Sequence, residues 1–577
     1  MQNYFEEYDA IWVVKFAFSQ PPGEVPAPFY LVAEDVHTGQ RIHLTGNDLQ
    51  KSMPPFTTEE RSLFIGYDAA VEWGCFLSLG WPLPKQVLDL YVEFRNLTYN
   101  LPIVEDYSLT NVLAYYGIDS PLASGAQTIP ERMTWREPFT ENEKHSLKQY
   151  CDDHVDCQVK LFYEMAANID LPRALYRGRY MTTVACIERN GIPVDVELLD
   201  RLNANWDAIK GRLIHALDEH GIWEGTTFKV DRFTRFLMEN KIPWPCCANG
   251  QLKLDKETFR EMARMYPELC KVQQLRYSLS DLRLTALSVG HDGYNRTGLR
   301  PFRSKTGRNQ PSNTRFIFGP AVWIRSLIKP QPDHFVAYLD YSQQEFAIAA
   351  VLSGDKVMQE AYQSGDPYLA FAKQAGAVPE DATKQTHPEE RERFKICALG
   401  VQYGMGEHSL AIRLNEPVFM ARQLLKMHQE TYAQYWEFIN KKVEAALLGH
   451  PLRTVFGWSL KAGDEPNPRS LANFPAQANG AEMLRIACTL AIEHGIRVCA
   501  PVHDALLVEG HIDEINTVIE RTKNYMIEAG HIVLNGFAMN VDVATITYPN
   551  QYADKRGLEM WATSIKLLTE IKEYETS

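Results

Sequence analysis

Two aspartates, each at the end of an apolar run, are the residues of this 577-residue chain best suited to chemistry. Asp340 ends "HFVAYLD", and Asp504 interrupts "VCAPVHDALLVEG". A lone aspartate after a strand is most often a turn former or a helix cap. Two of them, flanked by the polar groups of "DYSQQE" and "VHDA", indicate carboxylates gathered at one sheet edge. Such a pair can hold two Mg²⁺ ions, or Mn²⁺, which act on phosphate oxygens in phosphoryl transfer.

The stretch "RERFKICALGVQYG", residues 391–404, supplies groups that could bind a phosphorylated ligand. A helix here places Arg391, Lys395, Leu399 and Tyr403 on one face, each about 40° round from the last. Cations at one end and apolar or flat groups at the other suit neither a core stripe nor a solvated face. The cations could take a triphosphate while the other two side chains lie along the sugar and base.

Bulk composition is that of an ordinary globular protein with several packed domains, at 45% hydrophobic and 23% charged residues. No apolar run is long enough for a membrane span, and "MQNYFEEYDA" lacks the features of a signal peptide. The ten cysteines include no C-x-x-C pair, which favours a reducing cytoplasm. In "CDDHVDC", Cys151, His154 and Cys157 could surround zinc, but no fourth ligand is evident and a plain helix is favoured.

Charge is distributed unevenly along the chain. The net charge of −14 argues against a generic polyanion binder. Residues 296–329 nevertheless contain no acid, and they carry these basic residues: Arg296, Arg300, Arg303, Lys305, Arg308, Arg315, Arg325 and Lys329. A solvated loop and a phosphate-binding segment explain this stretch equally well on composition.

Hydrophobic patterns predict an α+β protein with several lobes and a sheet collected from distant segments. Strand-like alternation covers residues 10–45, and "NGFAMNVDVATITYP" is strand-like as well. A buried strand is expected to end at Asp340 and a helix to start near Gln343, while two apolar runs form a tight hairpin at His503-Asp504. Helical patterns cover residues 140–178, about 180–290 and 385–450.

In this order, the three motifs around Asp340, Arg391 and Asp504 resemble those of DNA polymerase family A, the group of bacterial DNA polymerase I and its phage relatives. The resemblance implies that both aspartates ligate two metal ions. Gln343 and Glu345 would border the incoming dNTP, with Glu345 as the steric gate against a ribose 2′-hydroxyl. Arg391 and Lys395 would bind the triphosphate, Leu399 would pack on the nucleotide, and Tyr403 would guard the nascent base pair.

Two further segments resemble DNA-contact motifs of the family. "SKTGRNQPSN" is similar to its Thr-Gly-Arg segment, which assigns the basic stretch to nucleic acid through Arg303, Lys305 and Arg308. "RSLANFPAQANGAE" is similar to a helix whose Arg469, Asn473 and Gln477 would face template and primer, with His503 near the primer terminus. A proline inside a helix costs about 3 kcal/mol, so this helix is expected to begin or kink at Pro475.

The chain departs from the family pattern at two positions. Leu399 stands where Phe or Tyr is usual, so sugar and base selection are expected to differ. Ala505 stands where many members have Glu beside the catalytic Asp, a secondary loss that leaves activity expected. Together with the phage-like form, Leu399 also raises the hypothesis of a specialisation for DNA that carries 2-aminoadenine in place of adenine.

Residues 1–172 resemble the family's 3′–5′ exonuclease domain, an RNase H-like α/β fold, but lack most of its acids. Lys15 and Ala17 occupy the places of the first acid pair, and His154 that of the last acid, while Tyr150 is retained. Glu72 or Asp68 would be the surviving middle acid. A lysine would repel both metal ions, so we predict an inactive exonuclease remnant. Replacement by Asp152, Asp153 or Asp156 through a register shift is the alternative.

The resemblance implies a right-hand polymerase preceded by this domain. The expected domains are 1–172 exonuclease-like, 173–320 thumb and basic segment, 321–380 palm, 381–450 fingers and 451–577 second palm segment. We expect a monomer that binds primer-template DNA and dNTPs in a bacterial or phage-infected cytoplasm, with a replisome or processivity partner left open. No 5′-nuclease segment precedes residue 1, which favours the short phage or plasmid form.

Three rival interpretations stay open at this point. A single-subunit RNA polymerase shares the aspartates, but Glu345 argues against it. A polymerase with an active exonuclease needs replacement acids. A non-catalytic DNA-binding protein would have little use for the intact aspartates and cations.

Overall fold

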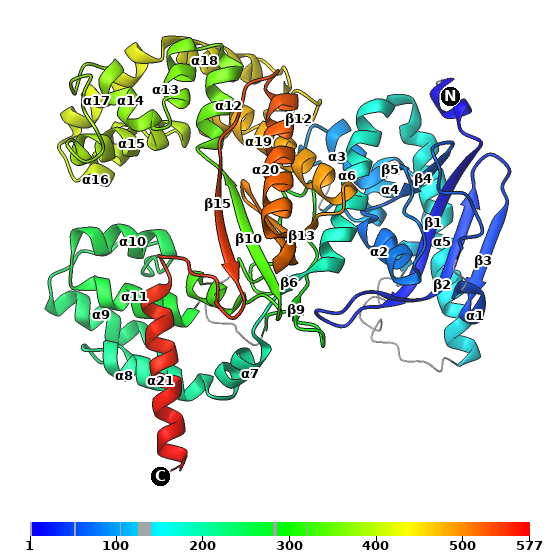
Figure 1. Ribbon diagram of the computed structural model, residues 1–577, viewed down its shortest axis with the longest axis horizontal. Coiled ribbons are helices and arrows are strands. Elements are labelled where there is room, and N and C mark those ends of the chain that lie inside the picture. Colours follow the sequence, from blue (N-terminus) through cyan, green and yellow to red (C-terminus); the bar gives the residue numbers. More distant parts are fainter. Residues whose placement is uncertain are drawn as a thin grey trace.

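The computed structural model describes residues 3–50, 53–103, 106–124, 140–247, 249–280, 286–319 and 321–576. A central lobe is built on an antiparallel sheet, with an amino-terminal α/β lobe on one side of it (Figure 1). Two helical lobes lie on the other side, one above the other in this view. In the described part of the chain, no helix is both long enough and apolar enough to cross a membrane.

The amino-terminal lobe contains a five-stranded sheet in the order β3-β2-β1-β4-β5. Its strands are β1 Ala10–Ser19, β2 Ala27–Asp35, β3 Arg41–Thr45, β4 Ser62–Gly66 and β5 Gln86–Asp89. Its helices are α1 Gly46–Leu49, α2 Ala70–Leu79, α3 Leu90–Leu97, α4 Leu109–Tyr115 and α5 Glu141–Met165. The three strands predicted between residues 10 and 45 are confirmed.

Side chains alternate across β1, so the two faces of this sheet belong to different cores. Val14 and Phe16 pack with Trp73 of α2 in one core, and Val13 and Ala17 pack in the other, which α5 contributes to. Lys15 therefore points to the face that α5 covers, among apolar neighbours.

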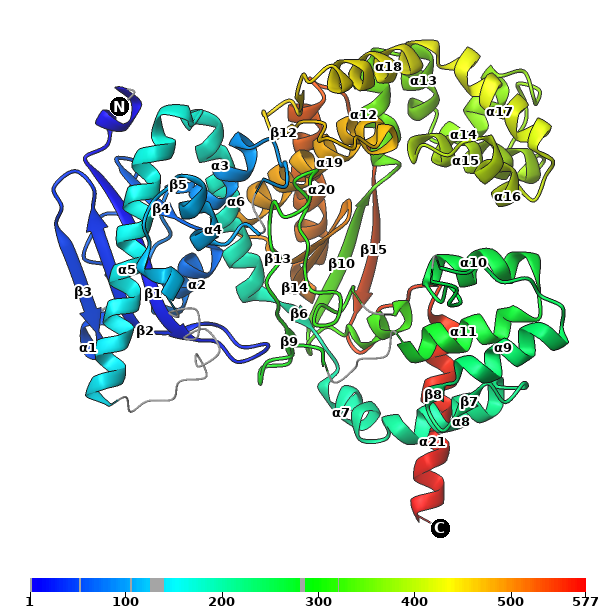
Figure 2. The same ribbon diagram turned by 180° about the vertical axis from the view of Figure 1, so that it is seen from behind.

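The central lobe carries a four-stranded antiparallel sheet in the order β13-β14-β10-β15. Its strands are β10 His334–Tyr341, β13 Arg497–Val502, β14 Ala505–His511 and β15 Val541–Thr547, and its long helices are α19 Pro468–Glu493 and α20 Ile515–Val533. The sheet is thus assembled from distant segments, and the predicted tight hairpin forms with His503 and Asp504 as its two turn residues. Figure 2 shows α20 and α19 beside this sheet from behind.

Helix α6, Leu171–Asn190, connects the amino-terminal lobe to the central lobe. Gly178 allows it to lie directly on β5, because a Cβ at this position would fall 1.8 Å from the backbone oxygen of Val87. A side chain there would separate the two elements. The small residue therefore sets how closely the lobes can dock.

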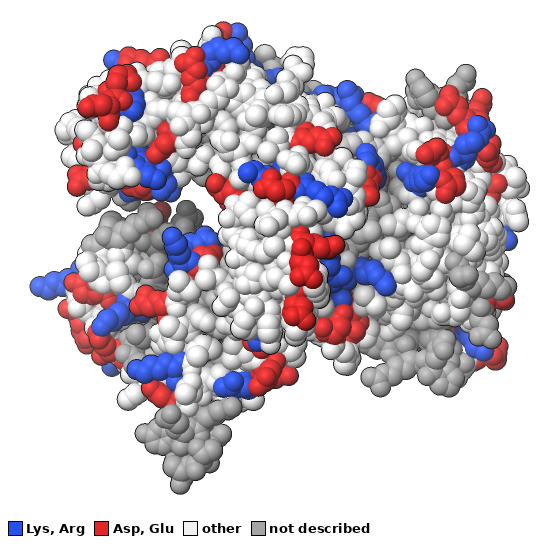
Figure 3. All heavy atoms as spheres, viewed as in Figure 1, with Lys and Arg blue, Asp and Glu red and all other residues white. Residues whose placement is uncertain are grey.

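The upper helical lobe consists of α12 Gln344–Ser353, α13 Lys356–Gln363, α14 Pro367–Gln374, α15 Pro388–Gln402, α16 Glu407–Leu414, α17 Val418–Thr431 and α18 Ala433–Leu447. The lower helical lobe includes α7 Val196–Ala204, α8 Trp206–Leu217, α9 Val230–Glu239, α10 Lys256–Met265, α11 Leu269–Ser280 and α21 Leu558–Thr576. Figure 3 shows the molecule hollowed between these two lobes.

Two elements differ from expectation. Helix α19 begins at Pro468, where the Asn467 side chain caps it, so Pro475 lies inside the helix and does not start it. Helix α21 packs against α8, with Leu568 and Ile571 in the core of the lower helical lobe. The end of the expected second palm segment, 451–577, therefore lies with the lower helical lobe.

Candidate active site

Asp340 lies near the end of β10, between two other strands. The register pairs it with Ala505 of β14 on one side and with Asp542 of β15 on the other. Directly opposed residues of an antiparallel sheet project to the same face. The turn that carries Asp504 abuts this row, because the Tyr341 amide donates to the Asp504 backbone oxygen at 3.2 Å. Folding thus brings both predicted aspartates to one sheet edge.

This acidic site is not neutralised by a protein cation. Within the described ranges, neither Asp340 nor Asp504 forms an ion pair with Lys, Arg or His. Burial, the Asp504 carboxylate and Asp542 together raise the pKa of Asp340 to about 7. None of the described residues supplies a hydrogen-bond partner for the buried Oδ1 atom of Asp340. Carboxylates in this state fit a divalent cation, which would supply the missing positive charge.

The aspartates form a pair and not a complete metal cage. No three His, Cys, Asp or Glu side chains among the described residues are grouped so as to hold a metal ion, which also holds for the stretch from Cys151 to Cys157. Mg²⁺ is commonly bound by one or two carboxylates together with substrate phosphates and water. A metal ion on such a pair would take its remaining ligands from water or from a bound substrate.

Helix α15 carries the predicted cationic and flat groups as expected. Arg391 Nε donates to Asp366 Oδ2 at 2.5 Å, and Lys395 Nζ lies 3.1 Å from Glu392 Oε2. Leu399 is half-buried on the same helix. Tyr403 closes the helix and is half exposed, and burial followed by the Glu345 charge raises its pKa. Asp504 also contributes to that shift, which places this end of α15 near the acidic site.

Two predicted site residues from separate segments, Arg308 and Glu345, meet near Tyr403. Arg308 Nη2 donates to Glu345 Oε1 at 2.9 Å, and both residues influence the Tyr403 hydroxyl electrostatically. Gln343, the residue before α12, has φ of 46°. Such left-handed conformations of non-glycine residues cost of order 1–3 kcal/mol and cluster at functional sites. His503 is a second case, with φ of 58° in the turn before Asp504.

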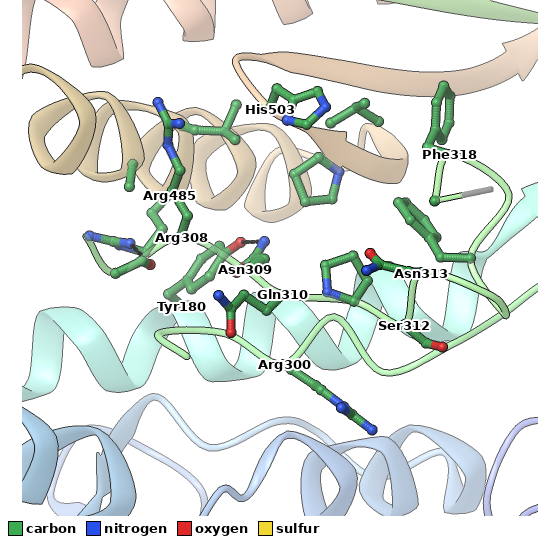
Figure 4. A pocket seen from close by; sticks show the side chains of 18 of the residues that line it. Tyr180, Arg300, Arg308, Asn309, Gln310, Ser312, Asn313, Phe318, Arg485 and His503 are labelled. Carbon is green, nitrogen blue, oxygen red and sulfur yellow. Dashed lines mark hydrogen bonds between the residues drawn. The ribbon is translucent and has the colours of Figure 1, made fainter. Parts of the chain in front are cut away.

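A cavity of about 800 Å³ lies between the His503 turn, α19 and the basic segment (Figure 4). Figure 4 shows Arg308 and Asn309 of the basic segment and Arg485 of α19 among the side chains that line this cavity. Arg469 is exposed at the start of α19, and Asn473 and Gln477 are half-buried further along the helix, outside the cavity. Arg303 and Lys305 are exposed on the basic segment.

Some candidate residues escaped the sequence analysis. Arg485 lies eight residues after Gln477, so the four-residue spacing of the polar positions on α19 could have revealed it. Asn309 and Gln310 follow directly on "SKTGR" and line the same cavity. Asp542 had only a weak signal, a single acid within the strand-like "NVDVATIT".

In the amino-terminal lobe, an internal ion pair lies where the resemblance to an exonuclease domain would place metal-binding acids. Lys15 Nζ lies 2.5 Å from Glu72 Oε1, and the two side chains are 14% and 3% exposed. Burial opposes the charge on Lys15, but the Glu72 carboxylate outweighs it and leaves the pKa of Lys15 above its ordinary value. Burial and the nearby lysine lower the pKa of His154 to about 3, so this imidazole is neutral beside Tyr150. Ala17 is fully buried.

The other acids of this lobe have structural partners. Asp89 accepts hydrogen bonds from the amides of Asp68 and Ala69 and caps α3. Glu93 forms a buried bidentate pair with Arg177 of α6 at 2.6 and 2.7 Å. A separate cluster joins Asp152 and Asp156 to one cation, Arg41, while Asp153 accepts from the Gln149 side chain.

Comparisons with known proteins agree with this geometry. Residues 318–547 match the model of DNA polymerase family A. The thermostable DNA polymerase I of Thermus aquaticus is 28% identical over 281 residues, which are 46% of this chain and 33% of that protein. DNA polymerase I of Chloroflexus aurantiacus is 23% identical over 320 residues, 51% of this chain and 34% of that protein. The chain thus spans about a third of the length of these curated relatives.

The fold is also shared with a solved structure, described as the POL domain of Pol1 from M. smegmatis in complex with DNA primer-template and dNTP. The match has a TM-score of 0.72 at 17% identity and covers 94% of this chain and 96% of that one. The sheet that carries Asp340 and Asp504, together with α15 and α19, lies within the segment matched by the family model. Residues 318–547 thus resemble DNA polymerase family A in sequence, and the chain shares the fold of a polymerase domain.

Proposed function

We propose that this protein is a DNA-dependent DNA polymerase that adds dNTPs to a primer 3′-hydroxyl. The observation that carries the proposal is the Asp340–Asp504 pair, which is only partly solvated, has no protein counter-ion in the described ranges and keeps one buried oxygen without a partner. Two carboxylates close together in a partly buried site lower the free energy of unfolding, and a bound cation would remove this cost. The match of residues 318–547 to the model of DNA polymerase family A supports this proposal.

Asp340 and Asp504 would hold the divalent metal ions, Mg²⁺ or Mn²⁺, which when bound stabilise charge on the reacting phosphate oxygens. Arg391 and Lys395 would exchange their acid partners Asp366 and Glu392 for the triphosphate. The Glu345 side chain, fixed by Arg308, would crowd a ribose 2′-hydroxyl and so select deoxyribose. Leu399 and Tyr403 would then lie along the base and sugar.

We further propose that the amino-terminal lobe is a 3′–5′ exonuclease fold without hydrolytic activity. Two-metal hydrolysis needs several negative oxygen ligands around the same ions. The Lys15 ammonium sits where such ions would be repelled, and it engages Glu72. The alternative acids Asp152 and Asp156 are committed to Arg41 instead. These contacts support the loss of proofreading.

The experiment uses a 5′-labelled primer on a longer template with Mg²⁺, with dNTPs, with ribonucleotides and with no nucleotide. We expect extension with dNTPs, little with ribonucleotides, and an unchanged primer without nucleotide. Equal use of ribonucleotides would refute the selective role of Glu345. Metal-dependent shortening of a mismatched primer, abolished by Glu72→Ala, would show an active exonuclease. Absence of extension would favour a non-catalytic DNA-binding protein.

A further inference from the structure

The backbone of residues 303–308, the DNA-contact segment, is held by three buried side chains from two lobes. Arg95 of α3 donates to the Arg303 oxygen at 2.5 Å. Trp458 and Arg485 of the central lobe donate to the oxygens of Lys305 and Gly307 at 3.0 and 2.7 Å. All three donors are at most 5% exposed. Every second carbonyl of the segment is thus fixed by a donor that solvent cannot replace.

The local turn fits against the same donors. The Arg308 amide donates to Ser304 Oγ at 2.7 Å, and the Gly307 amide donates to the Ser304 oxygen at 2.9 Å. Gly307 has φ of +73°, and a Cβ there would lie 3.2 Å from Trp458 Nε1 and 3.3 Å from Arg485 Nη1. Backbone conformation and packing therefore place the segment in one position, with Arg303 and Lys305 exposed to solvent.

Arg95 is itself oriented before it reaches the segment. Its Nε donates to Asn100 Oδ1 at 3.1 Å, its Nη1 donates to the Tyr91 hydroxyl at 3.2 Å, and its guanidinium lies 4.6 Å from the Tyr107 ring centroid. Asn100 in turn donates to the Ser459 oxygen at 2.7 Å, next to Trp458. Both views show α3 beside β12, Ser459–Leu460 (Figure 2). The two clamps from different lobes are thus joined to each other.

The amino-terminal lobe also contacts the side chain of Arg303. Its guanidinium lies 5.7 Å from the Tyr91 ring centroid and 3.4 Å from Asp68 Oδ2. Asp68 is one of the two candidates for the surviving middle acid of the exonuclease remnant. In this structure its carboxylate faces a basic residue of the DNA-contact segment, and its amide is fixed by Asp89.

We infer that the amino-terminal lobe, through Arg95, positions the DNA-contact segment 303–308 for primer-template DNA. This inference rests on the proposed polymerase function, because it assigns the segment a DNA contact. It gives the lobe a role that needs no hydrolysis. Arg95 is accordingly a positioning residue that acts through the Arg303 carbonyl and touches neither DNA nor nucleotide.

The test compares full-length variants for affinity and for kinetics. Arg95→Met removes the donors at similar length, and we expect a ~5- to 10-fold higher Kd for fluorescent primer-template in EDTA, because a buried carbonyl loses its partner. KM for primer-template should rise in parallel, while KM for dNTP stays within ~2-fold, since Lys395 and Arg391 are untouched. Trp458→Phe keeps an aromatic ring but removes the donor to the Lys305 oxygen, and it should also raise the Kd for primer-template.

Arg61→Gln serves as the matched control, because its pair with Asp9 lies in the same lobe but away from the segment. Its Kd should equal that of the wild type. Arg95→Lys keeps the charge with a shorter reach and should weaken binding ~2- to 3-fold, which tests the inference even if Arg95→Met does not fold. Hydrogen exchange of peptides covering 303–308 should be faster in both Arg95 variants.

The outcomes separate the two proposals. Wild-type protein that neither binds nor extends primer-template would overturn the polymerase function itself. Wild-type protein that does both, with Arg95 variants of unchanged Kd and unchanged exchange at 303–308, would overturn only the positioning role. An equal rise of KM for dNTP and DNA would indicate a general structural effect and would also overturn it.

Discussion

The central and amino-terminal lobes each place carboxylates against a sheet, but they settle the charge in opposite ways. Asp340 and Asp504 face one another without a protein cation in the described ranges, and the pKa of Asp340 rises to about 7. Glu72 instead meets the Lys15 ammonium in a nearly solvent-free pocket. The first arrangement keeps negative charge that a bound cation would balance, whereas in the second Lys15 balances the charge of Glu72 within the protein. A site that has been neutralised from within has no remaining attraction for metal ions.

The largest expected effect is on the chemical step in the central lobe. Asp340→Asn or Asp504→Asn should reduce primer extension on the order of 10³-fold or more, because the charge that holds the metal ions is halved. Binding of primer-template in EDTA should change little. Single-turnover extension and fluorescence anisotropy measure the two quantities. Normal extension by either variant would show that the carboxylate pair is not the reactive site.

The ion pair of the amino-terminal lobe should respond in the opposite sense, through stability and not activity. Lys15→Met leaves Glu72 buried and unpaired, and we expect a loss of roughly 3–5 kcal/mol from the folding free energy of this lobe. Lys15→Met/Glu72→Leu replaces the pair by apolar groups and should recover most of the loss. Calorimetry of each variant provides the comparison.

Arg61→Gln, which breaks the exposed pair with Asp9, controls for the loss of any cation from this lobe and should leave its melting temperature nearly unchanged. A Lys15→Met protein as stable as the wild type would mean that Glu72 finds another partner. In that case the pocket would not be neutralised by Lys15 alone.

The comparison also shows where sequence reasoning succeeded. The strands between residues 10 and 45, the His503-Asp504 hairpin and α15 follow from local alternation and helical spacing, and all of them form. Of the two alternatives for Pro475, a helix start or a kink, the structure excludes the start. Asn467 caps the helix ahead of Pro475, and buried residues on both sides of the proline, such as Leu471 and Ala478, add packing that offsets its cost.

Contacts between distant segments account for what was not predicted. The partner of Lys15 lies on α2 and the partner of Asp340 on β15, and neither pairing leaves a mark in local periodicity. Register across a sheet decides that Asp542, and not a neighbouring residue, lies opposite Asp340. The packing of α21 on α8 likewise depends on the final tertiary arrangement.

A smaller effect concerns the stability of the metal-free central lobe. The pKa of Asp340 in the folded protein is about 7, above the ordinary value of about 3.9, so the unfolded chain loses this proton at lower pH. The free energy of unfolding therefore falls as the pH rises from about 4 to above about 7. Asp340→Asn removes the cost and should stabilise the protein at pH 8 by roughly 2 kcal/mol after allowance for solvent screening. The gain should vanish near pH 4. Thermal melts in EDTA at both pH values measure it.

Mg²⁺ should reverse this ranking at pH 8, because the ion binds the folded wild-type pair more tightly than the variant. If Asp340→Asn were instead less stable than the wild type in EDTA, the carboxylate would be contributing to the fold, as Glu72 does.

The Lys395–Glu392 ion pair of α15 differs from the Lys15–Glu72 pair in its exposure to solvent. Lys395 and Glu392 are 36% and 52% exposed, so this pair can open to a ligand at little cost. Lys395→Ala should raise KM for dNTP ~10-fold, since one charge-assisted contact to phosphate is lost, while Kd for primer-template stays constant. Lys441→Ala, on α18, is the matched loss of an exposed paired lysine and should leave both values unchanged. A parallel rise in DNA Kd would place Lys395 at the duplex.

The smallest expected effect tests whether the charge of Asp542 contributes to metal binding at Asp340 and Asp504. Asp542 lies opposite Asp340 on the side away from Ala505, is exposed, and accepts a hydrogen bond from Ser342 at 2.5 Å. Its charge is a lesser cause of the raised Asp340 pKa. Asp542→Asn should therefore raise the Mn²⁺ dissociation constant, measured by electron paramagnetic resonance, by only ~2- to 3-fold, because water screens this charge. Asp513→Asn removes a distant exposed carboxylate of the same lobe and should leave Mn²⁺ affinity unchanged. Equal effects of the two substitutions would mean that only the net charge of the protein alters Mn²⁺ affinity. The acidic site would then consist of Asp340 and Asp504 without Asp542 of β15.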